Sequence, residues 1–273
     1  MTSAEYGVGI GWRPEIAGFV AGLPGLRFTE VVAESVPARG DLPPGLDDLR
    51  DRGVAIVPHG VRLSLGGADP VEPARVRHLA TVADRLGAPL VSEHIAFVRA
   101  AGIEAGHLLP LPRSREAVDA MVANVWRTQA ELNVPIALEP IAALFDWPDD
   151  ELDEGAFLTE ILERTGALLL LDVANVYANA INRGTDPLAL FDRVPLDRIA
   201  YLHVAGGAEH DGLYHDTHTD PVPRPVLDLL AELCARCRPP AVMLERDGDY
   251  PPAAELRDEL DAIAKASGYP AVT

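Results

Sequence analysis

Eight short apolar segments, each followed by a stretch with helical spacing, constrain the fold of this chain more than any other feature. Each segment is continuously apolar, which is typical of strands buried on both faces of a parallel sheet. Strand and helix alternating about eight times without a break in composition predict an α/β fold, the (β/α)₈ or TIM barrel, as a single domain over residues 1–273. The segments span residues 7–12, 27–35, 54–65, 89–97, 134–140, 167–173, 199–205 and 241–247.

The stretches between these segments carry apolar residues at helical spacing. Gly87 and Gly166 stand where helix C-caps are expected, and Asp153 stands where an N-cap is expected. The alternative fold is a doubly wound open sheet, but no glycine-rich phosphate loop follows the first strand, because its glycines lie within the strand itself. The predicted helices span residues 70–86, 114–132, 154–164, 187–193, 223–236 and 253–266.

Composition narrows the class of partner. The formal charge of −19 gives an acidic surface that repels a phosphate backbone, which counts against nucleic acid as a substrate. No apolar run is long enough to span a bilayer, and no basic segment followed by an apolar one marks a signal peptide. Cys234 and Cys237 are too few for a disulfide framework and fall within a helical pattern. We therefore expect a cytoplasmic protein with two free helix thiols and no membrane contact.

Ionisable and amide side chains stand where most of the predicted strands end. The carboxyl ends of the strands of a TIM barrel meet at one rim, where active sites lie. Unpaired buried carboxylates there would each cost several kcal/mol, and multivalent cations would offset that cost. The sequence therefore predicts a metal site at this rim. The candidates are Glu34, His59, Glu93, His94, Glu139, Asp172, Asn175, His203, Glu245 and, in the loop after the seventh strand, Asp216 and His218.

The chemistry of these donors indicates which metal would bind. None of the predicted strands ends in a cysteine, which argues against a structural zinc site. Imidazole, carboxylate and amide oxygen suit iron or manganese, and they also allow zinc. About eight candidate ligands exceed what one ion with open positions needs, so we expect two or three ions.

Short motifs run through the chain in step with the predicted strands and loops. They are Gly7-Val-Gly-Ile-Gly, Pro58-His-Gly-Val-Arg-Leu-Ser-Leu-Gly, Ser92-Glu-His, Leu138-Glu, Leu171-Asp-Val-Ala-Asn, His203-Val-Ala-Gly, Asp216-Thr-His and Glu245-Arg-Asp. In this order they resemble the multinuclear non-haem iron-dependent oxidative enzymes, a family that includes the methanobactin biosynthesis oxidase. The resemblance extends from Gly7 to about Tyr250. It implies a TIM barrel that holds two or three irons and uses dioxygen to modify a residue, commonly a cysteine, of a ribosomally made precursor peptide. It also implies a separate partner protein that recruits this peptide.

The resemblance also assigns roles to particular residues. Glu93 would orient an imidazole and, with Asp216, would take part in catalysis. Apart from the resemblance, Trp12 at the end of the first predicted strand, Arg62 near the rim and Asn179 are the expected substrate-binding residues. The implied metal ligands are His59, His94, Glu139, Asp172, Asn175, His203, Asp216, His218 and Glu245.

Two positions depart from the family pattern. Pro140 stands where the family commonly has asparagine, and Gly207 stands where it commonly has histidine. Neither departure removes an implied ligand, so we expect them to affect the substrate pocket rather than the metal site.

Three other functions fit a metal-binding barrel. A sugar isomerase or epimerase would use one or two ions with lysine or carboxylate acid–base groups, but the predicted rim has no lysine. A phosphodiesterase of the endonuclease IV type is disfavoured by the acidic surface. A non-catalytic metal-binding protein is compatible with the changes at Pro140 and Gly207.

Overall fold

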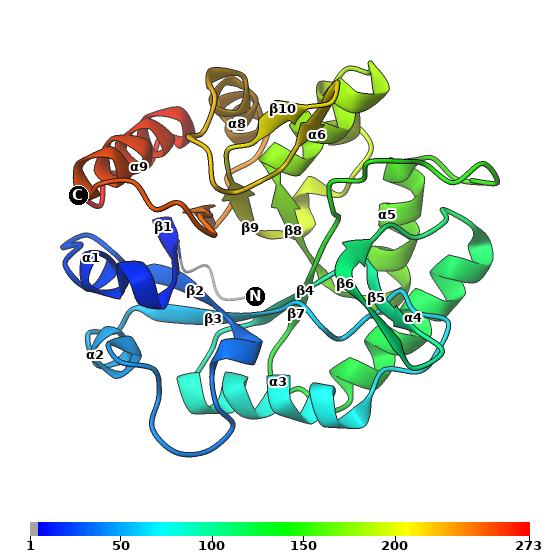
Figure 1. Ribbon diagram of the computed structural model, residues 1–273, viewed down its shortest axis with the longest axis horizontal. Helices are drawn as coiled ribbons and strands as arrows, with labels where there is room; N and C mark the ends of the chain where they lie inside the picture. The colour runs from blue at the N-terminus through cyan, green and yellow to red at the C-terminus, as the bar shows by residue number, and fades with distance from the viewer. Residues whose placement is uncertain (1–4) are drawn as a thin grey trace.

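Eight parallel strands close into a barrel, which confirms the predicted TIM-barrel fold (Figure 1). The computed structural model describes residues 5–273. The strands pair in the closed order β1-β12-β9-β8-β7-β4-β3-β2. Each predicted apolar segment contains one of them: β1 Gly7–Trp12, β2 Phe28–Val32, β3 Ala55–Gly60, β4 Val91–His94, β7 Ile136–Glu139, β8 Leu168–Asp172, β9 Ile199–Val204 and β12 Ala241–Leu244.

Helices surround the barrel, and the predicted caps end or begin them. Gly87 and Gly166 end α3 and α5 in the left-handed conformation, and Asp153 accepts a hydrogen bond from the N–H of Ala156 at the start of α5. Within residues 5–273, no helix is both long and apolar enough to cross a membrane. The helices are α1 Ala17–Ala21, α2 Leu46–Asp51, α3 Pro73–Leu86, α4 Arg115–Gln129, α5 Glu154–Thr165, α6 Val173–Arg183, α7 Leu188–Phe191, α8 Arg224–Arg236 and α9 Ala253–Ser267, with short 3₁₀ turns at η1 Pro14–Ile16, η2 Ala33–Ser35 and η3 Leu196–Arg198.

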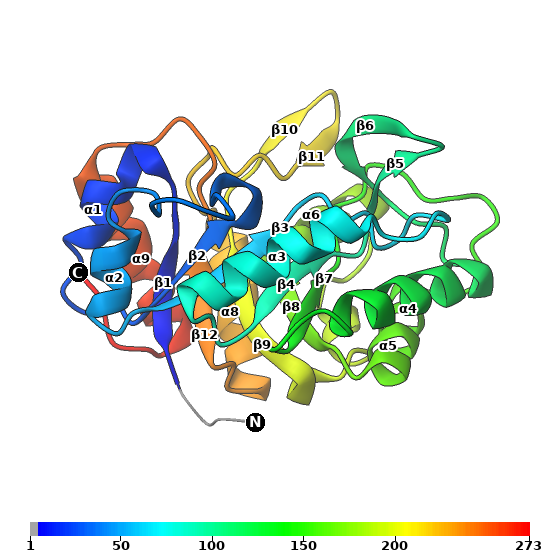
Figure 2. The same ribbon diagram turned by 90° about the horizontal axis from the view of Figure 1, so that it is seen from below.

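Three helices, α1, α2 and α6, and two hairpins lie outside the predicted elements. Helix α6 contains three asparagines, which have low helix propensity. It forms because Asp172 caps its N-terminus, accepting hydrogen bonds from the N–H groups of Ala174 and Asn175. The hairpins are β5 Phe97–Ala100 with β6 Ile103–Leu109, and β10 Ala208–His210 with β11 Leu213–His215. Both rise from the same end of the barrel, where the strands finish (Figure 2).

The core consists of two apolar layers, one inside the barrel and one between the barrel and the helices. The outer layer takes Val8, Ile10 and Trp12 from β1. The glycines that alternate with them leave room inside the barrel: a Cβ on Gly9 would lie only 2.5 Å from the carbonyl oxygen of Phe28. The inner layer consists of Phe28, Val57, Ala137, Leu170, Ala200, Tyr201, Ala241 and Met243.

Candidate metal centre

A polar layer lies directly above the inner apolar layer and contains most of the predicted ligands. Because side chains alternate along a strand, the residue two positions after an inward apolar side chain also points into the barrel. The resulting polar residues are all buried, with exposed fractions of 0–5%. On each strand the inward apolar residue and the polar residue two positions later are Phe28 and Glu30, Val57 and His59, Ala137 and Glu139, Leu170 and Asp172, Tyr201 and His203, and Met243 and Glu245.

The donors form four overlapping groups, and within each group the potential ligand atoms lie within 4.8 Å of one another. Neighbouring groups share a carboxylate or an imidazole, so the whole set is one continuous cluster and not four separate sites. A cluster of this size could bind metal ions. The groups are His59, His94 and Glu139; Glu139, Asp172, His203 and Glu245; Asp172, Asp216 and His218; and His218, Glu245 and Asp247.

Glu139 connects the imidazoles on the barrel side of the cluster. Its Oε2 lies 3.5 Å from Nε2 of His59 and 3.3 Å from Nε2 of His94. Its Oε1 lies 3.1 Å from Nδ1 of His203. Glu139, His59, His94 and His203 are residue types that would hold metal together in this position.

His218 connects the carboxylates at the mouth of the barrel. Its Nε2 lies 2.6 Å from Asp216 and 3.9 Å from Asp172, and its Nδ1 lies 3.2 Å from Asp247. Its backbone has a φ of 55°, in the left-handed region that residues other than glycine rarely adopt. Strained backbone of this kind is concentrated at functional sites.

Several donor atoms in the cluster are buried without a hydrogen-bond partner. Leaving buried polar atoms unsatisfied is costly in a protein interior, whereas a cation placed between these atoms would satisfy them. The donor set of imidazole nitrogens, carboxylate oxygens and one amide oxygen fits iron, manganese or zinc. The atoms are Nδ1 of His94, Oε2 of Glu139, Oδ2 of Asp172, Oδ1 of Asn175, Nδ1 of His203 and Oδ1 of Asp216.

The electrostatics of the protein groups alone show how strongly the cluster attracts positive charge. Burial by itself would lower the pKa of His94, but Glu139 and Glu93 outweigh burial and raise that pKa to about 9. Burial, followed by the neighbouring carboxylate of Asp216, raises the pKa of Asp172 well above its ordinary value. Both shifts favour the binding of protons in this site, and a metal ion would compete with those protons.

Two further predicted residues lie against the cluster. The Nδ2 of Asn175 donates to the carbonyl of Pro140 at 3.2 Å, its oxygen has no partner, and the residue lines the same cavity as Asp216 and His218. Glu93 accepts hydrogen bonds from the N–H groups of Leu63 and His94, and one of its oxygens lies 3.4 Å from Nδ1 of His94. That contact would hold the ring with Nε2 toward Glu139.

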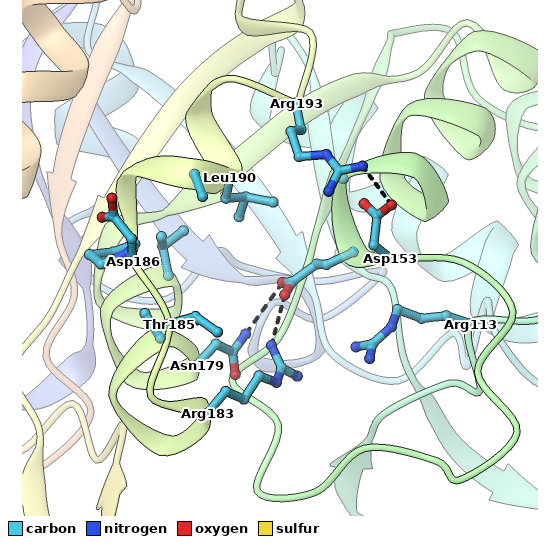
Figure 3. Close-up of a pocket in the computed structure, with 14 residues that line it drawn as sticks. Arg113, Asp153, Asn179, Arg183, Thr185, Asp186, Leu190 and Arg193 are labelled. Carbon is cyan, nitrogen blue, oxygen red and sulfur yellow. Dashed lines mark hydrogen bonds and ion pairs between the residues drawn. The ribbon is translucent and has the colours of Figure 1, made fainter.

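The three residues expected to bind substrate are not brought together. Trp12 is 1% exposed and lies in the outer core, on the opposite face of β1 from the glycines. Arg62 is exposed and lies 3.8 Å from Glu104 of the β5–β6 hairpin. Asn179 lies on α6 beside a separate cavity of about 260 Å³ (Figure 3). Its amide bonds to the backbone of residues 141 and 143, so in this structure it holds the loop after β7 against α6.

Several residues of the site were not identified from the sequence. Glu30 hydrogen-bonds to His203 and Tyr201, and Ser92 hydrogen-bonds to His59 and Tyr201. The signal for Glu30 was present, since a glutamate in the middle of an apolar strand must have a partner.

Asp247 and Arg13 form a second group at the site: Asp247 was part of the Glu245-Arg-Asp motif but not an implied ligand, and Arg13 was not identified. Asp247 completes the donor group with His218 and Glu245, and Arg13 lies 2.5 Å from Asp247 and 3.5 Å from Glu245. Arg13 follows directly after the first strand, and nothing in its sequence context indicated this pair.

The two departures from the family pattern have different surroundings. Pro140 offers its carbonyl to Asn175 and so helps to place that side chain. Gly207 lies beneath the β10–β11 hairpin: a Cβ there would come within 2.3 Å of the carbonyl oxygen of His215 and 2.7 Å of the ring of Tyr214. No larger side chain fits at this position unless the hairpin moves.

The cluster opens into a cavity of about 250 Å³ at the mouth of the barrel. Beside it, the loop after β7 exposes Leu144, Phe145 and Trp147, and the rings of Phe145 and Trp147 pack edge to face. Three exposed apolar side chains within four residues are suited to contact with an apolar part of a ligand. The cavity is lined by His94, Leu108, Glu139, Ile141, Ala142, Leu144, Asn175, His215, Asp216 and His218.

Comparisons with solved structures show where else this barrel occurs. Endonuclease IV from Thermus thermophilus superimposes with a TM-score of 0.60 at 17% identity, covering 95% of this chain and 98% of that one. D-psicose 3-epimerase from Clostridium cellulolyticum, solved with D-tagatose, gives 0.56 at 13% identity, covering 96% of this chain and 95% of that one. At such low identities these likenesses establish the fold alone.

Comparisons of sequence establish the family. A UPF0276 protein of Streptomyces avermitilis is 54% identical over 271 residues, which covers 97% of this chain and 55% of that protein. The chain thus spans about half the length of that relative. The family model described as RiPP precursor modification enzyme MbnB/TglH/ChrH, where RiPP denotes a ribosomally made and modified peptide, matches residues 7–267. This chain therefore belongs to the MbnB/TglH/ChrH family of RiPP precursor modification enzymes.

Proposed function

We propose that this protein is an iron- and dioxygen-dependent oxidase or oxygenase that modifies a residue, most suitably a cysteine, of a ribosomally made precursor peptide. The observation that carries the proposal is the convergence of buried donor atoms without partners at the mouth of a barrel from this family. Donors of these types, shared between neighbouring groups, suit two or three iron ions. Manganese and zinc could occupy the same positions.

Each part of the cluster has a separate task in this proposal. The implied ligands would hold the metal, which would supply the redox chemistry that no protein side chain can provide. Glu93 keeps the ring of His94 in the orientation needed for Nε2 to bind. Asp216 borders the mouth cavity, and its carboxylate could bind metal through one oxygen and accept a proton from a bound substrate through the other.

The mouth of the barrel suits a peptide better than a small polar molecule. The cavity of about 250 Å³ accommodates a side chain and part of its backbone, and the apolar loop with Leu144, Phe145 and Trp147 continues the surface outward. Arg62, at the edge of the β5–β6 hairpin, would contact the peptide outside the cavity. We propose that a separate partner protein recruits the peptide. The two free thiols, Cys234 and Cys237, fit a reducing cytoplasm.

Metal content and oxygen consumption test this proposal. The protein would be purified without oxygen, loaded with Fe²⁺ and assayed with a short cysteine-bearing peptide encoded beside its gene. Glu139→Gln and His203→Ala remove one donor each from the shared groups, so we expect both variants to bind less iron and to lose peptide-dependent oxygen consumption. Glu209→Gln, on the exposed part of β10, is the matched control and should behave like the wild type. Unchanged iron stoichiometry in both site variants would contradict the metal assignment.

The same experiment separates this function from that of a sugar epimerase. An epimerase would work with manganese under nitrogen and would not need a peptide. The only lysine of the chain, Lys265, lies exposed on α9 and is not part of the cluster. Turnover of a ketose with manganese and no consumption of oxygen would favour the epimerase.

A further inference from the structure

A chain of buried hydrogen bonds lies beneath the metal centre and crosses the inside of the barrel. It starts at His203, whose Nε2 lies 2.9 Å from Oε2 of Glu30. The hydroxyl of Tyr201 lies 2.5 Å from the same oxygen and 2.7 Å from Oγ of Ser92. Oγ of Ser92 in turn lies 2.8 Å from Nδ1 of His59. All five side chains are buried, with exposed fractions of at most 2%.

The direction of each hydrogen bond follows from the chemistry of the groups. The carboxylate of Glu30 can only accept, so the Tyr201 hydroxyl and the Nε2–H of His203 both donate to it. Tyr201 has one proton, and Ser92 must therefore donate its own proton to the Tyr201 oxygen. Ser92 then has only lone pairs left for His59, so His59 must carry its proton on Nδ1. One carboxylate thus determines the proton position on a ring that it does not touch.

The ring atoms left free by this arrangement face the metal centre. His203 presents Nδ1, which lies 3.1 Å from Glu139 and 2.9 Å from Glu245. His59 presents Nε2, which lies 3.5 Å from Glu139. The two imidazoles therefore use different nitrogens, and the hydrogen-bond chain accounts for the difference.

We propose that Glu30, Tyr201 and Ser92 form one positioning unit that fixes the tautomers of two metal-binding imidazoles, so that His203 binds metal through Nδ1 and His59 through Nε2. The proposal rests on the assignment of both histidines as ligands under the proposed function. Hydrogen-bond partners behind a ligand typically change metal affinity by about 10- to 100-fold when they are removed. The unit adds a coupling between strands β2, β4 and β9, which do not pair with one another in the barrel.

The test uses Zn²⁺, which is diamagnetic, as the probe in the full-length protein. Zinc affinity is measured by competition with a chelator, and nitrogen-15 NMR of labelled histidines shows which ring nitrogen carries the proton. In the wild type we expect a protonated Nε2 on His203 and a protonated Nδ1 on His59. Tyr201→Phe should shift the Nδ1–H signal of His59, spare that of His203, and weaken zinc binding by about tenfold. Tyr269→Phe removes a buried tyrosine hydroxyl on the outer side of the fold and is the matched control.

Glu30 provides the second arm of the test. Glu30→Leu removes the acceptor and should disturb the signals of both histidines, although Glu30 contacts only His203. Glu30→Gln keeps one acceptor oxygen and should restore most of the affinity and both signals. If Glu30→Leu does not fold, Tyr201→Phe and Glu30→Gln still test whether the positioning unit fixes the two tautomers. Variants whose histidine signals and zinc affinity match those of Tyr269→Phe would overturn the positioning unit alone. A wild-type protein that binds no Zn²⁺ through these histidines would overturn the proposed function as well.

Discussion

The β10–β11 hairpin packs closely against Gly207, and we expect that this packing requires a residue without a side chain. Replacing Gly207 with alanine tests this expectation and its consequence for the candidate metal centre. The new Cβ would lie 2.3 Å from the carbonyl oxygen of His215 and 2.7 Å from the ring of Tyr214. Ordinary contacts of a Cβ begin at about 3.4 Å, so the hairpin must shift by roughly 1 Å.

The hairpin cannot make this shift freely. His215 pairs with Ala208 in the two-stranded sheet, and the side chain of Asn182 forms two hydrogen bonds with the backbone of Tyr214, at 2.9 and 2.7 Å. Overpacking against a fixed backbone typically costs about 1–3 kcal/mol. At about 2–4 °C per kcal/mol for a chain near this size, we expect the Tm to fall by about 2–12 °C.

The shift should also reach the metal centre. The hairpin leads directly into Asp216 and His218, and the N–H of His218 donates to the carbonyl of Gly206 at 3.0 Å. We therefore expect Gly207→Ala to weaken binding in the group formed by Asp216 and His218, by about tenfold or more.

Thermal unfolding and a metal titration measure both effects. The control is Gly248→Ala in a neighbouring loop, where the nearest atom would be a methyl carbon of Thr219 at 3.5 Å, an ordinary contact. If the Tm and the metal stoichiometry of Gly207→Ala equal those of Gly248→Ala, the hairpin is not held in the position described and the reasoning fails.

Three further predictions concern the barrel interior, the cysteines and the metal. Gly9→Ala should lower the free energy of unfolding by about 1–3 kcal/mol in a denaturant titration, because its Cβ would collide with Phe28. The control Gly18→Ala, whose Cβ would have no atom within 4 Å, should not destabilise the fold. Equal unfolding midpoints for the two variants would contradict this prediction. Burial raises the pKa of Cys234 to about 12, so the thiol stays protonated at pH 8. Iodoacetamide should therefore alkylate Cys234 about a thousand times more slowly than it alkylates free cysteine. Comparable alkylation rates, measured by mass spectrometry, would show that the thiol is accessible and ionised. A metal ion at about 100 times its Kd should stabilise the fold by about 2.7 kcal/mol and raise the Tm, and EDTA should reverse this effect. A Tm that does not change on addition of EDTA would argue against a bound ion.

The positions of the strands and of most residues of the candidate metal centre could be predicted because both depend on local patterns. An apolar run identifies a buried strand, and the polar residue at its end, such as His203 in β9 or Glu139 in β7, must lie at the rim of a parallel barrel. Helix α6 was missed because its asparagines weaken the helical pattern, and it depends on the cap provided by Asp172. The hairpins were missed because their strands pair only with each other and lie outside the repeated strand–helix pattern of the barrel.

The sequence alone thus predicted the fold class, the rim where the strands end and the types of donor atom at that rim. Periodicity and strand ends depend on neighbouring residues, so local sequence is sufficient to predict them. Tertiary structure alone decided that Glu30 meets His203 and Tyr201 across the barrel, that Arg13 pairs with Asp247, and that Gly207 must stay small. These contacts join residues as many as 234 positions apart. Their geometry depends on how the strands tilt and stagger when the barrel closes, and no local pattern in the chain encodes that closure.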